Sequence, residues 1–419
     1  MKTNNYLDRL GKRAVIAFNS LADLNEKQKN KTLYDYILEL KKNKKKILQA
    51  NTLDIKLARS KKIKENIIER SILNNDRIDS IIKSIREVIK LKDPTKKILS
   101  SWKRPNGLII QRISMPIGVI GVIYEARPNV TADISILCFK SGNCAILRGG
   151  TEAFHSNTIL SALFRKVLKK NKINPDCIQL VNKTSRDHVD YLLSSMKSYI
   201  DVIVPRGGKG LVKKVLDLSK VPVIGHLEGL CHVYIDSGAN LEMAKKVVLN
   251  AKLRRTSICG AAETLLIHKK VITTHLVPII NILHKNNCKI IGDKLVKKYF
   301  PLSTLAKEQD WKTEYLDAII SVKIVNSIDE AIAHIKKYGT NHTESIITQN
   351  KKNAQKFLNE INSSIVMHNT STQFADGYEF GLGAEVGIST NKLHPRGPVG
   401  LEQLTSYKYI VKGNGQIRP

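Results

Sequence analysis

From Pro116 onward, the sequence alternates apolar runs of strand length with amphipathic segments of helix length. This alternation is typical of parallel sheets that are covered by helices on both faces, so it predicts an α/β protein with two such domains. Ligands usually bind beyond the carboxyl ends of the strands in these sheets. The predicted strands are 117–124, 144–147, 177–181, 201–204 and 221–224 in a first series, and 264–267, 289–291, 319–325, 345–348 and 364–367 in a second.

The residues before this region read as helices. Between residues 5 and 92, apolar side chains recur at three- and four-residue spacing, for example at Ile78, Ile81, Ile82 and Ile85. Two strand-like stretches, 108–114 and 407–411, belong to neither α/β series. Alone they would leave exposed sheet edges, so we expect them to mediate contacts between subunits of a homo-oligomer.

The chain carries 69 Lys and Arg against 37 Asp and Glu, a formal charge of +32. Such an excess can indicate nucleic-acid binding. The basic residues, however, are spread along the whole chain with only two Trp and eight Phe, and no aromatic-studded basic motif accompanies them. The longest apolar stretch, 115–124, is shorter than the roughly 18 residues that span a bilayer. We therefore expect no specific nucleic-acid partner, no membrane and a cytoplasmic location.

Six cysteines form no CxxC pair and are too dilute for a disulfide framework. Cys259 stands out because it lies between the two α/β series, where a cleft between domains is expected. A nucleophilic cysteine needs a lowered pKa, for which Arg254 and Arg255 are available; the alternative is a buried small apolar residue, our interpretation of the other five. There is no P-loop, HExxH or EF-hand motif, and we expect no metal site.

Longer motifs carry a resemblance to a known family. The segment 325–346 resembles the signature of the gamma-glutamyl phosphate reductases, which are members of the aldehyde dehydrogenase superfamily. The similarity covers essentially the whole chain. It continues through Tyr124–Thr131, Asn250–Leu265, Phe374–Gly377, Phe380–Thr390 and Gly397–Leu401.

The resemblance implies a domain organisation. A Rossmann-like cofactor-binding domain would comprise residues 1–99 and 117–253, and a catalytic domain would comprise 254–396. Residues 100–116 and 397–419 would form a β flap for oligomerisation, in a dimer or a tetramer. The fold is thus expected to be aldehyde dehydrogenase-like, with two parallel-sheet domains.

The resemblance also implies a reaction in proline biosynthesis. Cys259 would attack the acyl phosphate of L-glutamyl 5-phosphate, expel phosphate and form a thioester. Hydride from NADPH would then give L-glutamate 5-semialdehyde. The Cys259 backbone N–H and the Asn129 amide would stabilise the oxyanion, and the substrate could be channelled from glutamate 5-kinase.

The same similarity implies binding residues. The loop after the 144–147 strand resembles the adenosine-ribose loop, where Arg148 would hold a 2′-phosphate and favour NADP(H), and the turn at 206–210 resembles the loop near the pyrophosphate. Candidates for the substrate's anionic groups are Arg127 and Arg396; Asp376 and Glu385 are candidates for its ammonium group or for structure. The cofactor set is Arg148, Gly149, Gly150, Glu152, Arg206, Gly207 and Gly208.

Two questions stay open at this level. His226 aligns with the general-base glutamate of hydrolytic aldehyde dehydrogenases, but Glu228 is only two residues away. A hydrolytic or CoA-acylating dehydrogenase is the alternative that the long signature disfavours. Within that signature, we expect His334, His342 and Glu344 to be structural.

Overall fold

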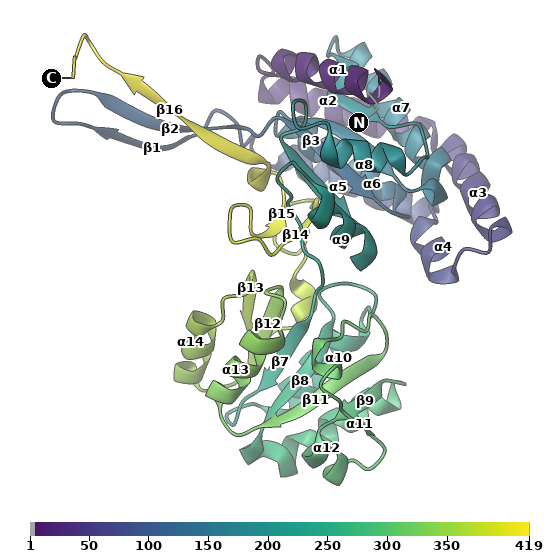
Figure 1. The fold of residues 1–419 in the computed structure, drawn as a ribbon, viewed down its shortest axis with the longest axis vertical. Coiled ribbons are helices and arrows are strands. Elements are labelled where there is room, and N and C mark those ends of the chain that lie inside the picture. Colours follow the sequence, from purple (N-terminus) through teal and green to yellow (C-terminus); the bar gives the residue numbers. More distant parts are fainter. Residues whose placement is uncertain (1–4, 419) are drawn as a thin grey trace. The chain divides into compact units, whose positions relative to one another are not determined.

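The computed structural model describes residues 5–418 and divides into two compact units. The first unit runs to Gly225 and adds residues 381–387 and the stretch from Val399 onward. The second unit comprises 226–380 and 388–398. Each contains a parallel sheet with helices (Figure 1), so the predicted α/β class with two sheet domains is confirmed.

The first unit begins with five helices, as the apolar spacing predicts. An Asn25 capping box starts the second helix, and the fifth buries Ile78, Ile81, Ile82 and Ile85 along one face. These helices pack against the helices of the sheet layer, and their apolar faces join one continuous core. They are α1 (Asn5–Leu21), α2 (Glu26–Lys42), α3 (Lys44–Ser60), α4 (Glu65–Ser71) and α5 (Asn75–Lys90).

A four-stranded parallel sheet forms the centre of this unit, in the order β5-β4-β3-β6. The predicted strand at 221–224 makes only an isolated bridge between Ile203 and Val223. The loops after three of these strands reach the same edge of the sheet. The elements are β3 (Val119–Tyr124), β4 (Cys144–Gly149), β5 (Ile178–Leu180), β6 (Val202–Arg206), α6 (Pro128–Lys140), α7 (Phe154–Lys170), α8 (Asp187–Ser194) and α9 (Lys209–Leu218).

The second unit is built on a seven-stranded sheet in the order β10-β9-β11-β8-β7-β12-β13. Every neighbouring pair in it is parallel. The strands are β7 (Cys231–Ile235), β8 (Ala262–His268), β9 (Lys289–Gly292), β10 (Thr304–Leu305), β11 (Ile319–Val325), β12 (Thr343–Ile347) and β13 (Ile365–His368). The helices are α10 (Leu241–Leu253), α11 (Val277–Lys285), α12 (Lys294–Tyr299), α13 (Ile328–Tyr338) and α14 (Lys351–Glu360).

Strand β7 is absent from the sequence prediction, and it shifts the boundary between the units. Because β7 and α10 belong to the second sheet, that unit begins at His226 rather than at residue 254. Cys231 and His232 interrupt the apolar pattern, yet both are fully buried. The carboxylate of Glu344 on β12 accepts from the His232 backbone N–H and lies 2.9 Å from its Nδ1, so it provides partners for two polar groups of this buried histidine.

Two small sheets use the remaining strands. β1 (Ile98–Lys103), β2 (Ile109–Pro116) and β16 (Thr405–Lys412) pair antiparallel, and Figure 1 shows them as an extended ribbon. β14 (Gly387–Ser389) pairs with β15 (Gly397–Val399). Both stretches that read as strands outside the α/β series are therefore strands. The ribbon exposes several apolar side chains, namely Ile98, Leu99, Trp102, Ile109, Tyr407, Tyr409 and Val411.

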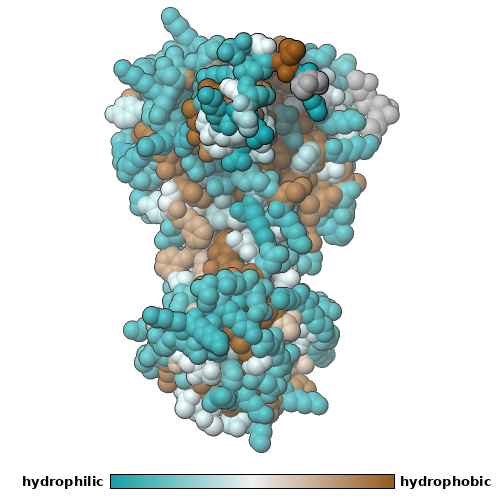
Figure 2. Space-filling view, turned by 90° about the vertical axis from the view of Figure 1, so that its left-hand side faces the viewer, coloured by the Kyte–Doolittle hydropathy of each residue, from teal (hydrophilic) through white to brown (hydrophobic). Residues whose placement is uncertain are grey.

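The surface shown in Figure 2 is mostly hydrophilic, as the 25% of charged residues in the chain leads one to expect. Hydrophilic side chains cover most of the face shown in Figure 2, and apolar ones form separate patches. Within residues 5–418, no helix combines the length and apolar character needed to cross a bilayer.

Candidate active site

The Cys259 side chain lies in the turn between α10 and β8, in the second unit. It is half-buried and packs against a small apolar cluster that contains Ala375 and Ile388. A Cβ added to Gly229 would lie 2.3 Å from the Cys259 carbonyl oxygen and 2.6 Å from its Cβ. A glycine is therefore required at position 229 to let the two segments approach.

Two imidazoles flank the Cys259 thiol. The Sγ atom and one ring nitrogen each of His226 and His342 lie within 4.8 Å of one another. The His226 Nδ1 is 2.7 Å from the Ile388 carbonyl oxygen, so Nδ1 carries the proton and donates. The two rings meet edge to face with centroids 4.8 Å apart. The sequence interpretation of His342 as purely structural misses this contact.

This cluster lies at the amino edge of its sheet. His226, Cys259 and His342 each precede a strand, respectively β7, β8 and β12, which are neighbours in the order β8-β7-β12. Cys259 is therefore an exception to the rule that ligands lie beyond the carboxyl ends of the strands in a parallel sheet. The segment 226–232 leads into β7 rather than following a strand at 221–224.

The electrostatics single out Cys259 among the six thiols. Burial alone would raise its pKa, but electrostatic interaction with the neighbouring His342 and His226 imidazoles holds the pKa well below its ordinary value. Burial instead raises the pKa of the other five thiols, Cys138, Cys144, Cys177, Cys231 and Cys288. Since the thiolate is the nucleophilic form, Cys259 is the thiol suited to covalent chemistry.

Glu314 is a further charged residue near Cys259 that was not predicted from the sequence. Burial raises the pKa of Glu314; its Oε1 accepts a 2.9 Å bond from the Gly229 backbone N–H, and its charge acts on Cys259 and His226. No motif in the sequence marks this residue. Glu228, the residue proposed as an alternative base, is half-buried and also interacts electrostatically with Glu314.

In the first unit, the Arg148 guanidinium, which was expected to hold a 2′-phosphate, is bonded to the protein backbone. This guanidinium is largely buried and donates to the carbonyl oxygens of Gly149, at 2.7 Å, and Thr184, at 2.9 Å. These bonds tie the loop after β4 to the loop after β5. Binding of a 2′-phosphate by Arg148 would require its guanidinium to leave these carbonyl oxygens, and it stays a prediction.

A cavity of about 150 Å³ lies beside this loop and is lined by Arg70, Glu125, Arg127, Glu152 and Gly207, together with two apolar residues. The Gly208 N–H donates to the Glu125 carboxylate at 2.8 Å, and a Cβ on Gly207 would lie 2.7 Å from that carboxylate. Similarly, a Cβ on Gly150 would lie 2.4 Å from the Glu152 carboxylate. The donor set suits one phosphate and one ribose of a dinucleotide, because arginines bind phosphates and carboxylates bind ribose hydroxyls.

Arg206 and Glu385, which the resemblance assigned to cofactor and substrate, form an ion pair at 3.2 Å. Next to them, burial raises the pKa of Asp133 to about 6. The Asn129 Nδ2 donates to the Asp133 carboxylate at 3.0 Å. The structure thus brings three predicted site residues, Asn129, Arg206 and Glu385, around one buried carboxyl.

Asp376 and Arg396, in the second unit, have local partners. The Asp376 carboxylate accepts from the backbone N–H groups of Tyr378, at 2.8 Å, and Glu379, at 3.3 Å, and so caps a turn. The Arg396 guanidinium donates to the side-chain and backbone oxygens of Asn362. These contacts hold each loop in shape; substrate binding by either residue stays a prediction.

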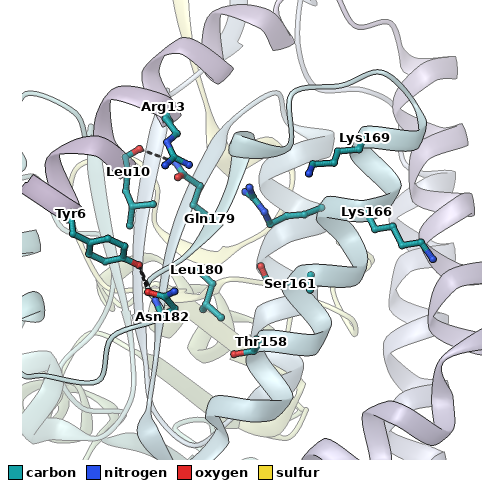
Figure 3. Close-up of a pocket in the computed structure, with 12 residues that line it drawn as sticks. Tyr6, Leu10, Arg13, Thr158, Ser161, Lys166, Lys169, Gln179, Leu180 and Asn182 are labelled. Carbon is teal, nitrogen blue, oxygen red and sulfur yellow. Dashed lines mark hydrogen bonds between the residues drawn. The ribbon is translucent and has the colours of Figure 1, made fainter.

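A second cavity, of about 640 Å³, lies between α1, α7 and β5 (Figure 3). None of the predicted site residues lines it. Two of its basic side chains have structural partners: Arg165 donates to the carbonyl oxygens of Pro175 and Ile178, and Lys166 pairs with Glu39 at 2.6 Å. We assign no function to this cavity.

Comparison with known proteins places these features in a family. Residues 2–288 match the aldehyde dehydrogenase family. The gamma-glutamyl phosphate reductase of Allorhizobium ampelinum is 49% identical over 410 residues, which cover 98% of this chain and 96% of that protein. The same enzyme of Bartonella quintana is 50% identical over 409 residues, which cover 98% and 99%.

A solved structure agrees with the sequence relatives. The gamma-glutamyl phosphate reductase of Thermotoga maritima superposes with a TM-score of 0.95 at 42% identity, covering 99% of this chain and 100% of that one. The reductase-like motifs, the two parallel-sheet units and the cysteine cluster are therefore found in a chain whose full length matches one enzyme family. The chain belongs to the gamma-glutamyl phosphate reductases of the aldehyde dehydrogenase family.

Proposed function

We propose that this oxidoreductase reduces L-glutamyl 5-phosphate to L-glutamate 5-semialdehyde and phosphate with NADPH, in proline biosynthesis. Full-length similarity to gamma-glutamyl phosphate reductases supports the substrate. The single structural observation that carries the mechanism is the lowered pKa of Cys259 between two imidazoles. The other five thiols lack this environment.

In the proposed mechanism, the Cys259 sulfur attacks the acyl carbon. A C–S bond forms, the bond from carbon to the phosphate oxygen breaks, and inorganic phosphate leaves. NADPH, when bound, supplies the hydride for the thioester carbon. The resulting thiohemiacetal alkoxide then collapses, its C–S bond breaks, and Cys259 leaves as a thiolate stabilised by His226 and His342.

Both steps pass through a tetrahedral oxyanion. The Cys259 backbone N–H and the Asn129 amide are the proposed donors, and a fixed donor is worth about 3–4 kcal/mol in comparable sites. The Asn129 side chain is exposed and is oriented by Asp133. For the substrate's charged groups we propose Arg127 and Arg396 as anion partners, and Asp376 and Glu385 as ammonium partners.

The test of the function is NADPH consumption in a coupled assay. Because glutamyl phosphate is labile, it should be generated in place from glutamate, ATP and a glutamate 5-kinase. We expect the NADPH absorbance to fall only when glutamate, ATP and the kinase are all present. Absence of turnover with NADPH, or equal turnover without the kinase, would contradict the proposal.

A cofactor-preference prediction follows from Glu152. Its carboxylate lines the small cavity, where it would bind ribose hydroxyls but repel a 2′-phosphate. Changing Glu152→Gln should raise the ratio of NADPH to NADH affinity by about three- to tenfold, since one partly exposed like charge contributes about 1 kcal/mol. Titration of nucleotide fluorescence on the protein measures both affinities.

The control for Glu152→Gln is Arg148→Gln, a charge-removing change at the end of the preceding strand β4. Because its guanidinium ties two loops together through carbonyl oxygens, this change should weaken both nucleotides alike. If only the affinity for NADPH fell, Arg148 would have to leave those carbonyl oxygens and bind the 2′-phosphate. An unchanged ratio in Glu152→Gln would mean that Glu152 does not lie at the ribose.

We further propose a homo-oligomer that assembles through the ribbon of β1, β2 and β16, and channelling from a glutamate 5-kinase. The ribbon exposes Trp102, Tyr409 and Val411, which an intersubunit contact would bury. Deleting residues 405–419 removes β16 and should shift the assembly toward monomer in sedimentation velocity. A full-length protein that sediments as a monomer at micromolar concentration would contradict this prediction.

A further inference from the structure

The Cys259 cluster has the composition of a metal site as well as that of a nucleophile. Its three donor atoms, one sulfur and two imidazole nitrogens, lie within 4.8 Å of one another and belong to the same compact unit. We propose that His226, Cys259 and His342 form a site for Zn²⁺, which binds reversibly and blocks the nucleophile. The inhibitory effect rests on the proposed function; binding itself does not. This proposal revises the sequence expectation of no metal site.

The His226 imidazole is oriented so that one of its ring nitrogens can bind a metal ion. The His226 Nδ1–H is fixed on the Ile388 carbonyl oxygen at 2.7 Å, which leaves Nε2 as the unprotonated nitrogen of the neutral ring. A histidine that ligates zinc commonly donates its other N–H to a carbonyl in this way, because that bond fixes the tautomer and the ring orientation.

His342 provides the second, independent observation. Its side chain is fully buried, and its Nδ1 lies 2.9 Å from the Thr343 hydroxyl oxygen. Its Nε2 is buried without a hydrogen-bond partner among the described residues. An orphaned imidazole nitrogen in a protein interior costs free energy, and a metal ion beside a thiolate would satisfy it.

The dimensions suit a tetrahedral ion after a small contraction. Zn–S and Zn–N bonds of about 2.3 and 2.0–2.1 Å place tetrahedral ligands about 3.3–3.6 Å apart. The donor pairs lie within 4.8 Å, so the widest would need to close by at most about 1.2–1.5 Å. Cys259 is half-buried on a turn, where rotation of its side chain can supply this movement. Three protein ligands leave the fourth position for water, as in open zinc sites.

Charge and ligand chemistry favour Zn²⁺ over the abundant hard cations. A thiolate with two imidazoles is a soft to intermediate donor set, whereas Mg²⁺ and Ca²⁺ prefer oxygen ligands. The Cys259 thiolate cancels one positive charge, and the nearby Glu314 carboxylate adds a second negative charge. If Cys259 starts as a thiol, binding releases its proton to solvent while the Zn–S bond forms.

The test uses Co²⁺ as a spectroscopic probe on the reduced full-length protein without substrate. We expect one equivalent to bind and to give a thiolate-to-cobalt charge-transfer band in the near ultraviolet, with the intense visible bands of four-coordinate Co²⁺. One equivalent of Zn²⁺ should bleach both. Absence of the charge-transfer band at a several-fold excess of Co²⁺ would overturn the proposal.

Variants assign the ligands. Cys259→Ser should lose the charge-transfer band, and His342→Gln should weaken Co²⁺ binding at least about tenfold with its circular dichroism unchanged. Cys288→Ser, a buried thiol of the same unit, is the matched control and should keep the band. Cys231 needs its own variant, since its sulfur lies 3.5 Å from the His342 Nδ1. A band that survives in Cys259→Ser and disappears in Cys231→Ser would refute the proposed site.

Inhibition is measured separately. Zn²⁺ should protect Cys259 from alkylation by iodoacetamide, detected by peptide mass spectrometry, and should stop NADPH oxidation until a chelator is added. Protein that shows the cobalt band but no reductase activity would overturn the proposed function and leave the metal site standing. Full reductase activity with one equivalent of Zn²⁺ bound would contradict the proposal that the ion blocks Cys259.

Discussion

Replacing Cys259 with alanine is expected to abolish reduction of glutamyl phosphate, lowering kcat/KM by about three orders of magnitude or more. The loss follows because the thioester cannot form, and the five remaining thiols are buried with raised pKa values. The protein should stay folded, since the side chain is half-buried at a turn and packs only on the edge of a small cluster. Coupled NADPH consumption and thermal unfolding measure the two effects.

Cys288→Ala is the control for this variant. Cys288 is buried in the core of the same unit, so its truncation should lower stability by about 1 kcal/mol while kcat stays within about twofold of the parent. If Cys259→Ala retained appreciable turnover, or if Cys288→Ala lost it, another group would have to carry the acyl intermediate. Either result would contradict the assignment of the nucleophile.

The architecture was predictable where hydrophobic periodicity is uninterrupted. β3 and β4 are continuous apolar runs, and α5 carries isoleucines at helical spacing, so each could be identified locally. β7 was not, because Cys231 and His232 look polar in the sequence. His232 becomes compatible with a central strand through Glu344, and Cys231 through the Cys259 carbonyl oxygen; Glu344 is more than a hundred positions away from His232 in the sequence.

The same missing strand explains the errors at the site. Without β7, the segment 226–232 appears to follow a strand, and nothing in the sequence places His226 and His342 beside Cys259. His342 becomes a neighbour of Cys259 only through the order β8-β7-β12. Cys259 itself could be chosen from its position and its motif, whereas Glu314 depends entirely on a tertiary contact with Gly229.

The reverse reaction gives the second large prediction. Oxidation of glutamate semialdehyde with NADP⁺ should depend on added phosphate or arsenate, with a rate about a hundredfold lower without either, because a general base typically contributes about 10²–10⁴ to a step such as thioester hydrolysis. At position 226 the enzyme has an imidazole that lies against the Cys259 thiol, in place of the glutamate expected in hydrolytic aldehyde dehydrogenases. Phosphate would then release the acyl group by attacking the thioester carbon and displacing the Cys259 thiolate.

Two carboxylates could undermine this prediction, and each can be tested directly. Glu314 acts electrostatically on Cys259, and Glu228 lies in the segment that leads into β7. NADPH formation should be measured with and without phosphate in the parent, in Glu228→Gln and in Glu314→Gln. We expect the small phosphate-independent rate to be the same in all three proteins, since neither carboxylate activates water. A fast phosphate-independent rate in the parent that disappears in one variant would identify that carboxylate as a hydrolytic base, and the enzyme would then be a hydrolytic dehydrogenase rather than a phosphorylating one.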